Sequence, residues 1–149
     1  MKKIKPIFLG IIAAICLFAG TSFNQVASAK GNDYPDITTK YDTNNMSQYS
    51  DDQLDQYVTM KKFYVQGISY DKQHRERIVF TSQPDSKDYY FTVLKGNKHH
   101  KKLVVGDQVT IKGSVGPRQT LEKSSPANKF FDNKFFGKQM IFVLTDSYK

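Results

Sequence analysis

Four short runs of aromatic and β-branched residues follow one another through the middle of the chain, and they limit what it can fold into. The runs lie at residues 62–70, 77–81, 89–94 and 104–115. Turn-forming residues separate them at 70–72, 83–86 and 95–97. Short strands at this spacing predict a small antiparallel sheet that curls into a barrel or sandwich.

The fourth run has the clearest strand pattern. Val109, Ile111 and Val115 alternate with polar residues, and only Gly113 interrupts the alternation. A period of two is typical of a strand with one buried face, so we expect Val109 and Ile111 in the core. Residues 138–148 alternate as well and predict a fifth strand that closes the sheet.

Two segments carry a resemblance to a known fold. They are Val65-Gln66-Gly67 and Val105-Gly106-Asp107-Gln108-Val109-Thr110-Ile111-Lys112-Gly113. With the two strands between them they resemble the oligonucleotide/oligosaccharide-binding (OB) barrels, and most closely the exported, tRNA-anticodon-domain-like group. The resemblance covers roughly residues 60–149. It implies a mainly β protein with a five-stranded OB-like antiparallel barrel, in which Gly67 and Gly113 let strands bend as the sheet closes. These motifs indicate fold more than function.

A short helix is expected just before the first strand. Ser50 and Gln53 have the spacing of a capping box, and Leu54, Tyr57 and Val58 form one apolar stripe. We therefore assign residues 50–149 to the barrel domain. Residues 30–49 are polar and show no period, which predicts a flexible N-terminal segment whose tyrosines dock partly on the domain.

Residues 1–29 have the three parts of a secretory signal peptide. Lys2, Lys3 and Lys5 form a positive start, residues 7–18 form a short apolar core, and Ala27-Ser28-Ala29 is a small-x-small cleavage pattern. Cleavage after Ala29 predicts a protein that is secreted or associated with the cell surface. An uncleaved anchor is the alternative.

The single cysteine, Cys16, lies inside this signal. A lipoprotein would use it as the lipidated residue, but Ile15 stands where a small residue is expected. The mature chain has no thiol, so it forms no disulfide and has no cysteine-based zinc site. Its hydrophobic core must therefore be sufficient to hold the fold.

The mature chain is moderately basic. Without the three lysines of the signal it keeps 19 basic and 14 acidic residues, a balance of +5. This charge favours an anionic polymer such as nucleic acid, a wall polymer or lipid headgroups, although plain solubility explains it equally well. Only three of the basic residues are arginines, which favours diffuse attraction over bidentate recognition of phosphate.

Two loops hold the candidate functional residues. Residues 95–102 contain four lysines and two histidines, and they either contact phosphate or form a solvated loop. Residues 128–131 and 133–136 repeat the segment Asn-Lys-Phe-Phe, whose aromatic pairs either stack on ligand rings or cap the open barrel end.

The resemblance implies a ligand face on the second and third strands, flanked by the first and last long loops. The charged candidates at its edge are Arg75, Arg77, Lys98, Lys101, Lys102, Lys129 and Lys134. The candidates for stacking on the rings of a base or sugar are Tyr89, Tyr90, Phe130 and Phe135.

No catalytic or metal-binding motif stands out in the sequence. The adjacent His99 and His100 make a poor chelate, and the acidic residues 51, 52 and 55 lack the glycine and glutamate of a calcium loop. We therefore predict a non-enzymatic binding module without a cofactor, with an anionic oligomer or polymer as the first candidate ligand. The alternatives are a secreted protein-interaction module or inhibitor and, with less support, a small hydrolase or nuclease.

Overall fold

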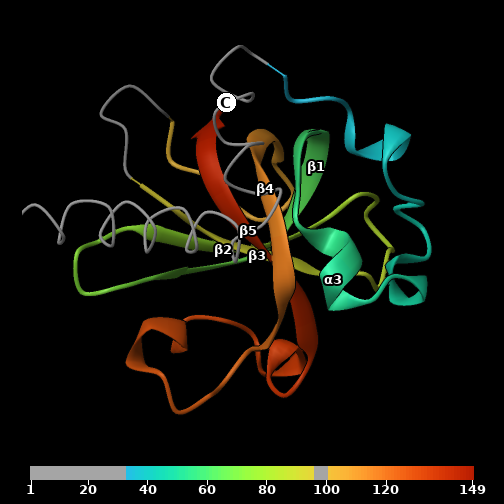
Figure 1. The fold of residues 1–149 in the computed structure, drawn as a ribbon. Coiled ribbons are helices and arrows are strands. Elements are labelled where there is room, and N and C mark those ends of the chain that lie inside the picture. The colour runs from blue at the N-terminus through green and yellow to red at the C-terminus, as the bar shows by residue number, and fades with distance from the viewer. Residues whose placement is uncertain (1–32, 96–100) are drawn as a thin grey trace, which may run out of the picture. The chain divides into compact units, whose positions relative to one another are not determined.

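Five strands close into a barrel in this computed structural model, which describes residues 33–95 and 101–149 (Figure 1). The strands are β1 (Gln56–Tyr70), β2 (Glu76–Thr81), β3 (Tyr90–Leu94), β4 (Gln108–Thr120) and β5 (Gln139–Tyr148). Around the barrel their order is β1-β2-β3-β5-β4, and β4 pairs with β1 to close the ring. The mainly β, OB-like barrel predicted from the sequence is confirmed. The predicted signal peptide, residues 1–29, lies outside the described residues.

One strand pair differs from the antiparallel arrangement that we predicted. β3 and β5 run parallel, with Tyr90 opposite Ile141 and Thr92 opposite Val143, whereas the other four pairs are antiparallel. The reason is geometric, because strand direction cannot alternate all the way round a closed ring with an odd number of strands. The barrel is therefore mixed.

The barrel interior is an apolar core to which every strand contributes. Val109 and Ile111 are fully buried in it, as the period-two pattern predicted. Phe63, Phe80 and Tyr90 form an aromatic cluster there, with ring centroids 5.4–6.0 Å apart. The other apolar side chains of this core with no more than 1% exposure include Val58, Met60, Val65, Ile78, Leu94, Val115 and Val143.

Two of the three glycines of the OB-like segments, Gly67 and Gly113, lie where the strands change register. The pairing of β1 with β2 shifts between Val65 and Gly67, and that of β4 with β5 shifts between Lys112 and Gly113. Both glycines are also sites of close approach. A Cβ on Gly113 would overlap the backbone carbonyl oxygen of Leu144 on β5.

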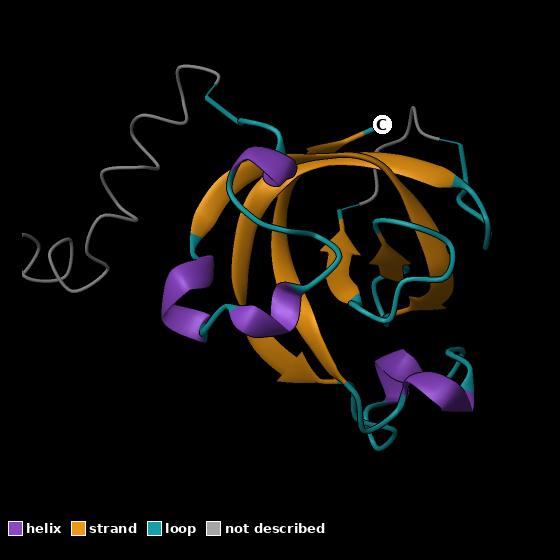
Figure 2. Cartoon of the chain, turned by 90° about the vertical axis from the view of Figure 1, so that its right-hand side faces the viewer, coloured by secondary structure: helices purple, strands orange, loops and turns teal. Residues whose placement is uncertain are grey.

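Residues 34–49 are packed on the barrel, which corrects the prediction of a flexible segment over residues 30–49. They form two short 3-10 helices, η1 (Ile37–Thr39) and η2 (Met46–Gln48), seen beside the strands in Figure 2. Ile37, Tyr41 and Met46 are buried in the barrel core. The segment is also held by backbone, since the Thr59 amide donates to the Pro35 carbonyl at 2.7 Å. Irregular spacing of its apolar residues hid this packing from periodicity arguments.

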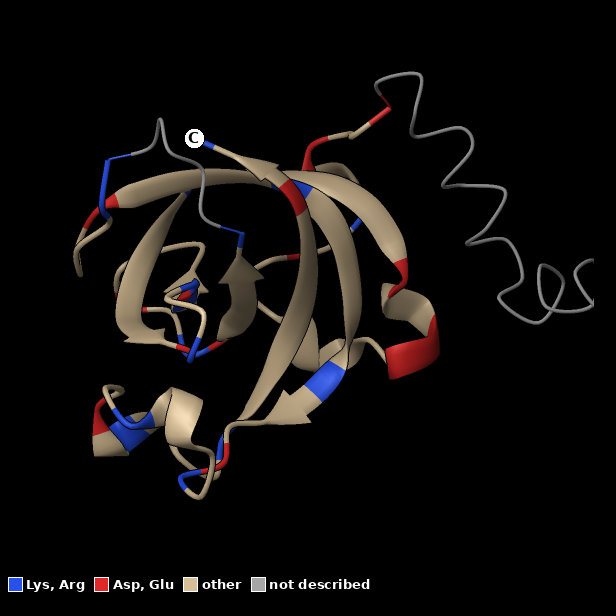
Figure 3. Ribbon diagram, turned by 90° about the vertical axis from the view of Figure 1, so that its left-hand side faces the viewer, with Lys and Arg blue, Asp and Glu red and all other residues tan. Residues whose placement is uncertain are grey.

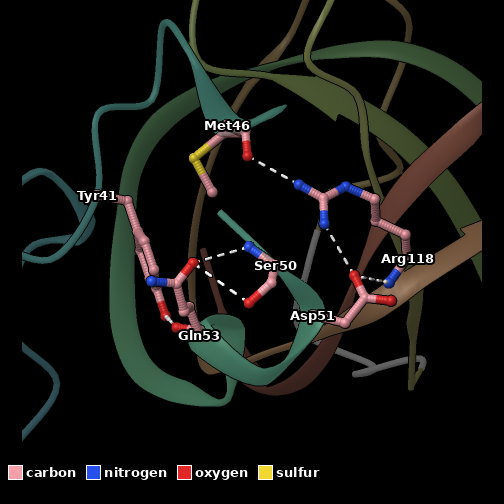
Figure 4. Close-up of polar contacts among 6 residues, drawn as sticks. All are labelled: Tyr41, Met46, Ser50, Asp51, Gln53 and Arg118. Atoms are coloured by element: carbon pink, nitrogen blue, oxygen red, sulfur yellow. Dashed lines mark hydrogen bonds and ion pairs between the residues drawn. The ribbon is translucent and has the colours of Figure 1, made fainter. Parts of the chain in front are cut away.

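The predicted short helix is α3 (Asp51–Leu54), and Figure 4 shows the contacts that fix it. The capping box predicted from Ser50 and Gln53 is formed, and the Gln53 side chain accepts from the Ser50 amide at 2.8 Å. The Ser50 hydroxyl also lies 3.3 Å from the side-chain oxygen of Gln53. Arg118 on β4 ties the region together, because it donates to Asp51 at 2.8 Å and to the Met46 carbonyl at 2.7 Å.

Candidate ligand-binding groove

The loop between β4 and β5, residues 121–138, covers the outer face of the barrel. It carries the 3-10 helices η3 (Pro126–Asn128) and η4 (Asn133–Phe135). Phe131 and Phe135 from this loop are buried at 5% and 1% exposure. They form a second apolar cluster with outward-facing residues of β2, β3 and β5, namely Val79, Phe91 and Met140. The β4–β5 loop therefore occupies much of the face on which the sequence placed the ligand.

Gly67 is what lets this loop sit so close to β1. A Cβ at Gly67 would lie 2.8 Å from Cε2 of Phe135 and 3.2 Å from Cδ1 of Phe131, and real Cβ contacts are essentially never below 3.0 Å. The obstruction is formed by side chains, which can move when the loop lifts.

We expect Gly67→Ala to loosen the β4–β5 loop and to leave the barrel folded. Overpacking of this kind costs about 1–3 kcal/mol, and the aromatic rings can take up the strain by shifting outward. Hydrogen exchange should show reduced protection of the Phe131 and Phe135 amides, which donate to Asn128 and Asp132. Unchanged protection of these two amides would show that the contact has no such role.

Two predicted stacking residues are corrected by the structure. Tyr90 is 0% exposed inside the barrel, and Phe135 is 1% exposed beneath the β4–β5 loop. A ring enclosed on both faces has no surface for a ligand ring. Tyr89 is half-buried, with Phe135 edge-on at 5.6 Å and the Lys138 ammonium 5.3 Å from its ring.

Polar contacts anchor the start of the β4–β5 loop to the sheet. The buried hydroxyl of Ser69 on β1 donates to the Ala127 carbonyl at 2.5 Å. Asn128, which is 3% exposed, donates to the Glu122 carbonyl at 2.8 Å and accepts from Arg77 at 3.0 Å. These bonds place η3 beside the end of β1.

A groove forms where η3 meets the loop between β1 and β2, residues 71–75. Tyr70, the last residue of β1, lies between two clefts that share Tyr70 and His74. One cleft, of about 440 Å³, is lined by Tyr70, Asp71, Lys72, His74, Pro126, Ala127, Lys129 and Phe130. The other, of about 430 Å³, is lined by Tyr70, His74, Glu76 and Lys102. We call the two clefts together the Tyr70 groove.

The wall of the groove formed by residues 71–75 is held by one carboxylate. Asp71 accepts from the Gln73 and Arg75 amides, each at 2.9 Å, and pairs with the Arg75 side chain at 2.6 Å. Burial acts to raise the pKa of Asp71, but these hydrogen bonds and the Arg75 charge outweigh it and hold the pKa below its usual value. His74 adopts a left-handed backbone conformation with φ of 59°, which the tight loop imposes.

The groove combines aromatic rings with positive charge. Phe130 is 59% exposed and meets Tyr70 edge-on, with the ring centroids 6.2 Å apart. The Lys102 ammonium lies 5.2 Å from the Tyr70 ring, and that of Lys129 lies 4.7 Å from the Phe130 ring. Figure 3 shows Lys and Arg segments in the loops around this end of the barrel, interspersed with acidic ones. Accessible rings beside lysines suit a ligand that has planar groups and negative charge.

One carboxyl group of the groove differs from its surroundings. Oε2 of Glu76 is buried and has no hydrogen-bond partner in the described part of the chain. Burial raises the pKa of Glu76, although a backbone hydrogen bond from Leu103 and the charge of Lys102 act in the opposite direction. A fall in pH therefore protonates Glu76 more readily than an exposed glutamate and makes the groove more positive.

The structure brings together only part of the predicted set of site residues. Lys102, Lys129 and Phe130 line the groove. The Arg75 side chain forms an ion pair with Asp71. The Lys134 ammonium lies 5.0 Å from the ring of the buried Phe135. Lys101 is exposed, and Lys98 lies outside the described residues. Arg77 lies beneath the β4–β5 loop and contacts Phe91 and Asn128.

Sequence reasoning missed Tyr70, Lys72 and His74 as groove residues. Tyr70 was assigned to a strand end and Lys72 to a turn, and nothing in the local sequence pairs either with the β4–β5 loop. The signal that could have revealed these residues is the position of their loop in the fold, because the first long loop of an OB-like barrel lies next to the last one.

Other kinds of site find less support. Among residues 33–95 and 101–149 no group of three or more His, Cys, Asp or Glu lies close enough together to hold a metal ion. Over the same residues no helix has the length and apolar character needed to cross a membrane.

Comparison of the chain with family models, with curated proteins and with solved structures gives no match. The fold and the groove define an OB-like barrel whose outer face is partly covered by its own loop.

Proposed function

We propose that this protein is a non-enzymatic binding module that holds an anionic oligomer or polymer in the Tyr70 groove. The observation that carries the proposal is a pair of accessible rings, the half-buried Tyr70 and the exposed Phe130, each with a lysine ammonium 4.7–5.2 Å from its centroid. Bases or sugars of the ligand would pack on the rings, and its phosphates or carboxylates would meet Lys72, Lys102 and Lys129. Resemblance to exported OB-like proteins supports the same role.

Affinity across a salt series tests this proposal, with single-stranded nucleic acid and an anionic wall polymer as separate probes. We expect Lys102→Ala/Lys129→Ala to flatten the salt dependence, by about 0.7 in logarithmic slope for each lost phosphate contact on a single strand. Tyr70→Ala should weaken binding at every salt concentration, by about 1–3 kcal/mol for each stacked base. The polymer that binds more tightly identifies the ligand class.

A matched control removes the same charge from elsewhere on the barrel. Lys40 and Lys112 are exposed and lie near the start of β1, where Lys112 is opposite Thr59, whereas Tyr70 ends the strand. Lys40→Ala/Lys112→Ala should leave the slope close to that of the parent. An equal flattening by both double variants would mean that net charge alone, and not the groove, attracts the polymer.

A protein-interaction module is the second candidate function. Val104 and Val105 are 54% and 62% exposed, side by side in the segment that leads into β4. Adjacent exposed valines favour contact with an apolar surface of a partner. Salt-insensitive capture of one protein, lost on Val104→Ser/Val105→Ser, would favour this function over polymer binding.

Secretion or surface attachment is part of the proposal. It rests on the basic start, apolar core and Ala27-Ser28-Ala29 pattern of residues 1–29. The intact mass of the exported protein should correspond to a chain that begins at Lys30. A product that retains Met1, or that begins at a lipid-modified Cys16, would contradict cleavage after Ala29.

A further inference from the structure

A second cavity lies on the other side of η3 from the Tyr70 groove. It has a volume of about 190 Å³ and lies between the β4–β5 loop and the outer face of the barrel. Its lining consists of Arg77, Phe91, Gln119, Thr120, Leu121, Glu122, Ser125, Asn128 and Met140. At about 30 Å³ for each water, this is room for roughly six waters, or for a small oxyanion with part of its shell.

Arg77 brings a positive charge to this cavity with little compensation. Its side chain donates to Asn128 Oδ1 at 3.0 Å, and its guanidinium carbon lies 4.9 Å from the centroid of the Phe91 ring. Nε is buried and has no hydrogen-bond partner in the described part of the chain. No ion pair found among residues 33–95 and 101–149 involves Arg77, so none of their carboxylates lies within 4.0 Å of its guanidinium.

The cavity is an unfavourable environment for the unpaired guanidinium group of Arg77. Burial lowers the pKa of Arg77 from its usual value, and the nearby Asp71 opposes that effect only in part. An arginine remains charged even so, and an unpaired buried donor costs free energy. The cation–π contact with Phe91 is a partial substitute for an anion.

The other polar groups of the cavity suit an acidic guest. Thr120 and Ser125 have hydroxyl groups that can donate to an oxyanion, and the amide of Asn128 is already fixed by the Glu122 carbonyl and by Arg77. Glu122 is the one acidic residue of the lining, and it is exposed. A guanidinium fork in a partly enclosed cavity is well matched to a carboxylate or a phosphate.

We propose that the Arg77 cavity is a separate binding site for a small oxyanion, a carboxylate or phosphate group, held by the Arg77 guanidinium beneath the β4–β5 loop. The site does not depend on the Tyr70 groove, because η3 separates the two and Arg77 does not line the groove. The shared chemistry is a compact anion with two or more acceptor oxygens.

Nuclear magnetic resonance of the folded protein tests this directly. Inorganic phosphate and acetate are titrated separately at constant ionic strength, while the Nε–Hε signal of Arg77 and the amide signals of Leu121 and Ser125 are followed. We expect a saturable shift of all three signals with at least one of the anions, and the anion that saturates first identifies the class. Shifts that stay linear to high concentration with both anions would overturn the proposal, since water then fills the cavity.

Two variants separate the effect of the planar guanidinium group of Arg77 from the effect of its positive charge. Arg77→Lys keeps the positive charge and loses the planar fork, so we expect the anion to bind about tenfold more weakly, which corresponds to ~1.4 kcal/mol. Arg75→Lys, on the exposed and Asp71-paired arginine, should leave the affinity unchanged. Equal weakening by both variants would overturn the assignment to the cavity. If Arg77→Lys does not fold, the Arg77 Nε titration of the parent protein decides the question.

Discussion

Gly113→Ala is expected to destabilise the barrel more than a single methyl group added at any other position. The new Cβ would overlap the carbonyl oxygen of Leu144 and lie 3.0 Å from the Thr145 Cα, so the obstruction is the backbone of β5. Gly113 also pairs with Val58 on β1, which leaves β4 no free side toward which it can move. We expect a loss at or above the roughly 1–3 kcal/mol of ordinary overpacking, measured as the midpoint of denaturant unfolding.

Gly116→Ala provides the matched control in the same strand. Its Cβ would lie 3.4 Å from the Phe142 carbonyl oxygen, which is ordinary van der Waals contact, and we expect a change within about 0.5 kcal/mol. If Gly113→Ala unfolds at the same denaturant concentration as the parent, β4 and β5 are further apart than the structure has them.

Ile111→Ala is expected to destabilise the protein by about 2–5 kcal/mol, the range for a large-to-small change in a packed core. Ile111 is 0% exposed inside the barrel and lies opposite Met60 on β1 and Tyr148 on β5. The cavity left by the change would lie between strands that are hydrogen-bonded on both sides, so it cannot easily collapse. The unfolding midpoint measures the effect.

Leu144→Ala is the control for the loss of an aliphatic side chain from the same sheet. Leu144 is 57% exposed on β5, so its replacement should change stability by no more than about 0.5 kcal/mol. Similar losses of stability for Ile111→Ala and Leu144→Ala would mean that Ile111 does not face the barrel interior and that the assignment of inward-facing residues on β4 is wrong.

The strands were predictable because their residues alternate with a period of two. That period placed Val109 and Ile111 in the core, and Gly67 and Gly113, which were expected to let strands bend, lie at register shifts. The parallel pairing of β3 and β5 follows from closure of a ring with an odd number of strands, so it depends on the whole fold and not on local sequence.

The β4–β5 loop shows why the site was harder to predict. Its two Asn-Lys-Phe-Phe segments are identical, yet the first buries its second phenylalanine and the second buries its first. Phe130 is 59% exposed, whereas Phe131 and Phe135 are at most 5% exposed. Local sequence cannot distinguish these positions, because burial depends on how η3 and η4 sit against Gly67 and Phe91. The same contacts bring Phe130 next to Tyr70, from a distant part of the chain.

The most direct test of the Tyr70 groove is to map where an anionic oligomer binds. The backbone amide signals of the protein are followed while the tighter-binding polymer, in short single-stranded or oligomeric form, is added at low salt. We expect the largest shifts at residues 70–75, 101–102 and 126–130, and their reversal on addition of salt. Shifts confined to the opposite end of the barrel, around η1 and Thr59, or no shifts at low salt, would contradict binding in the groove.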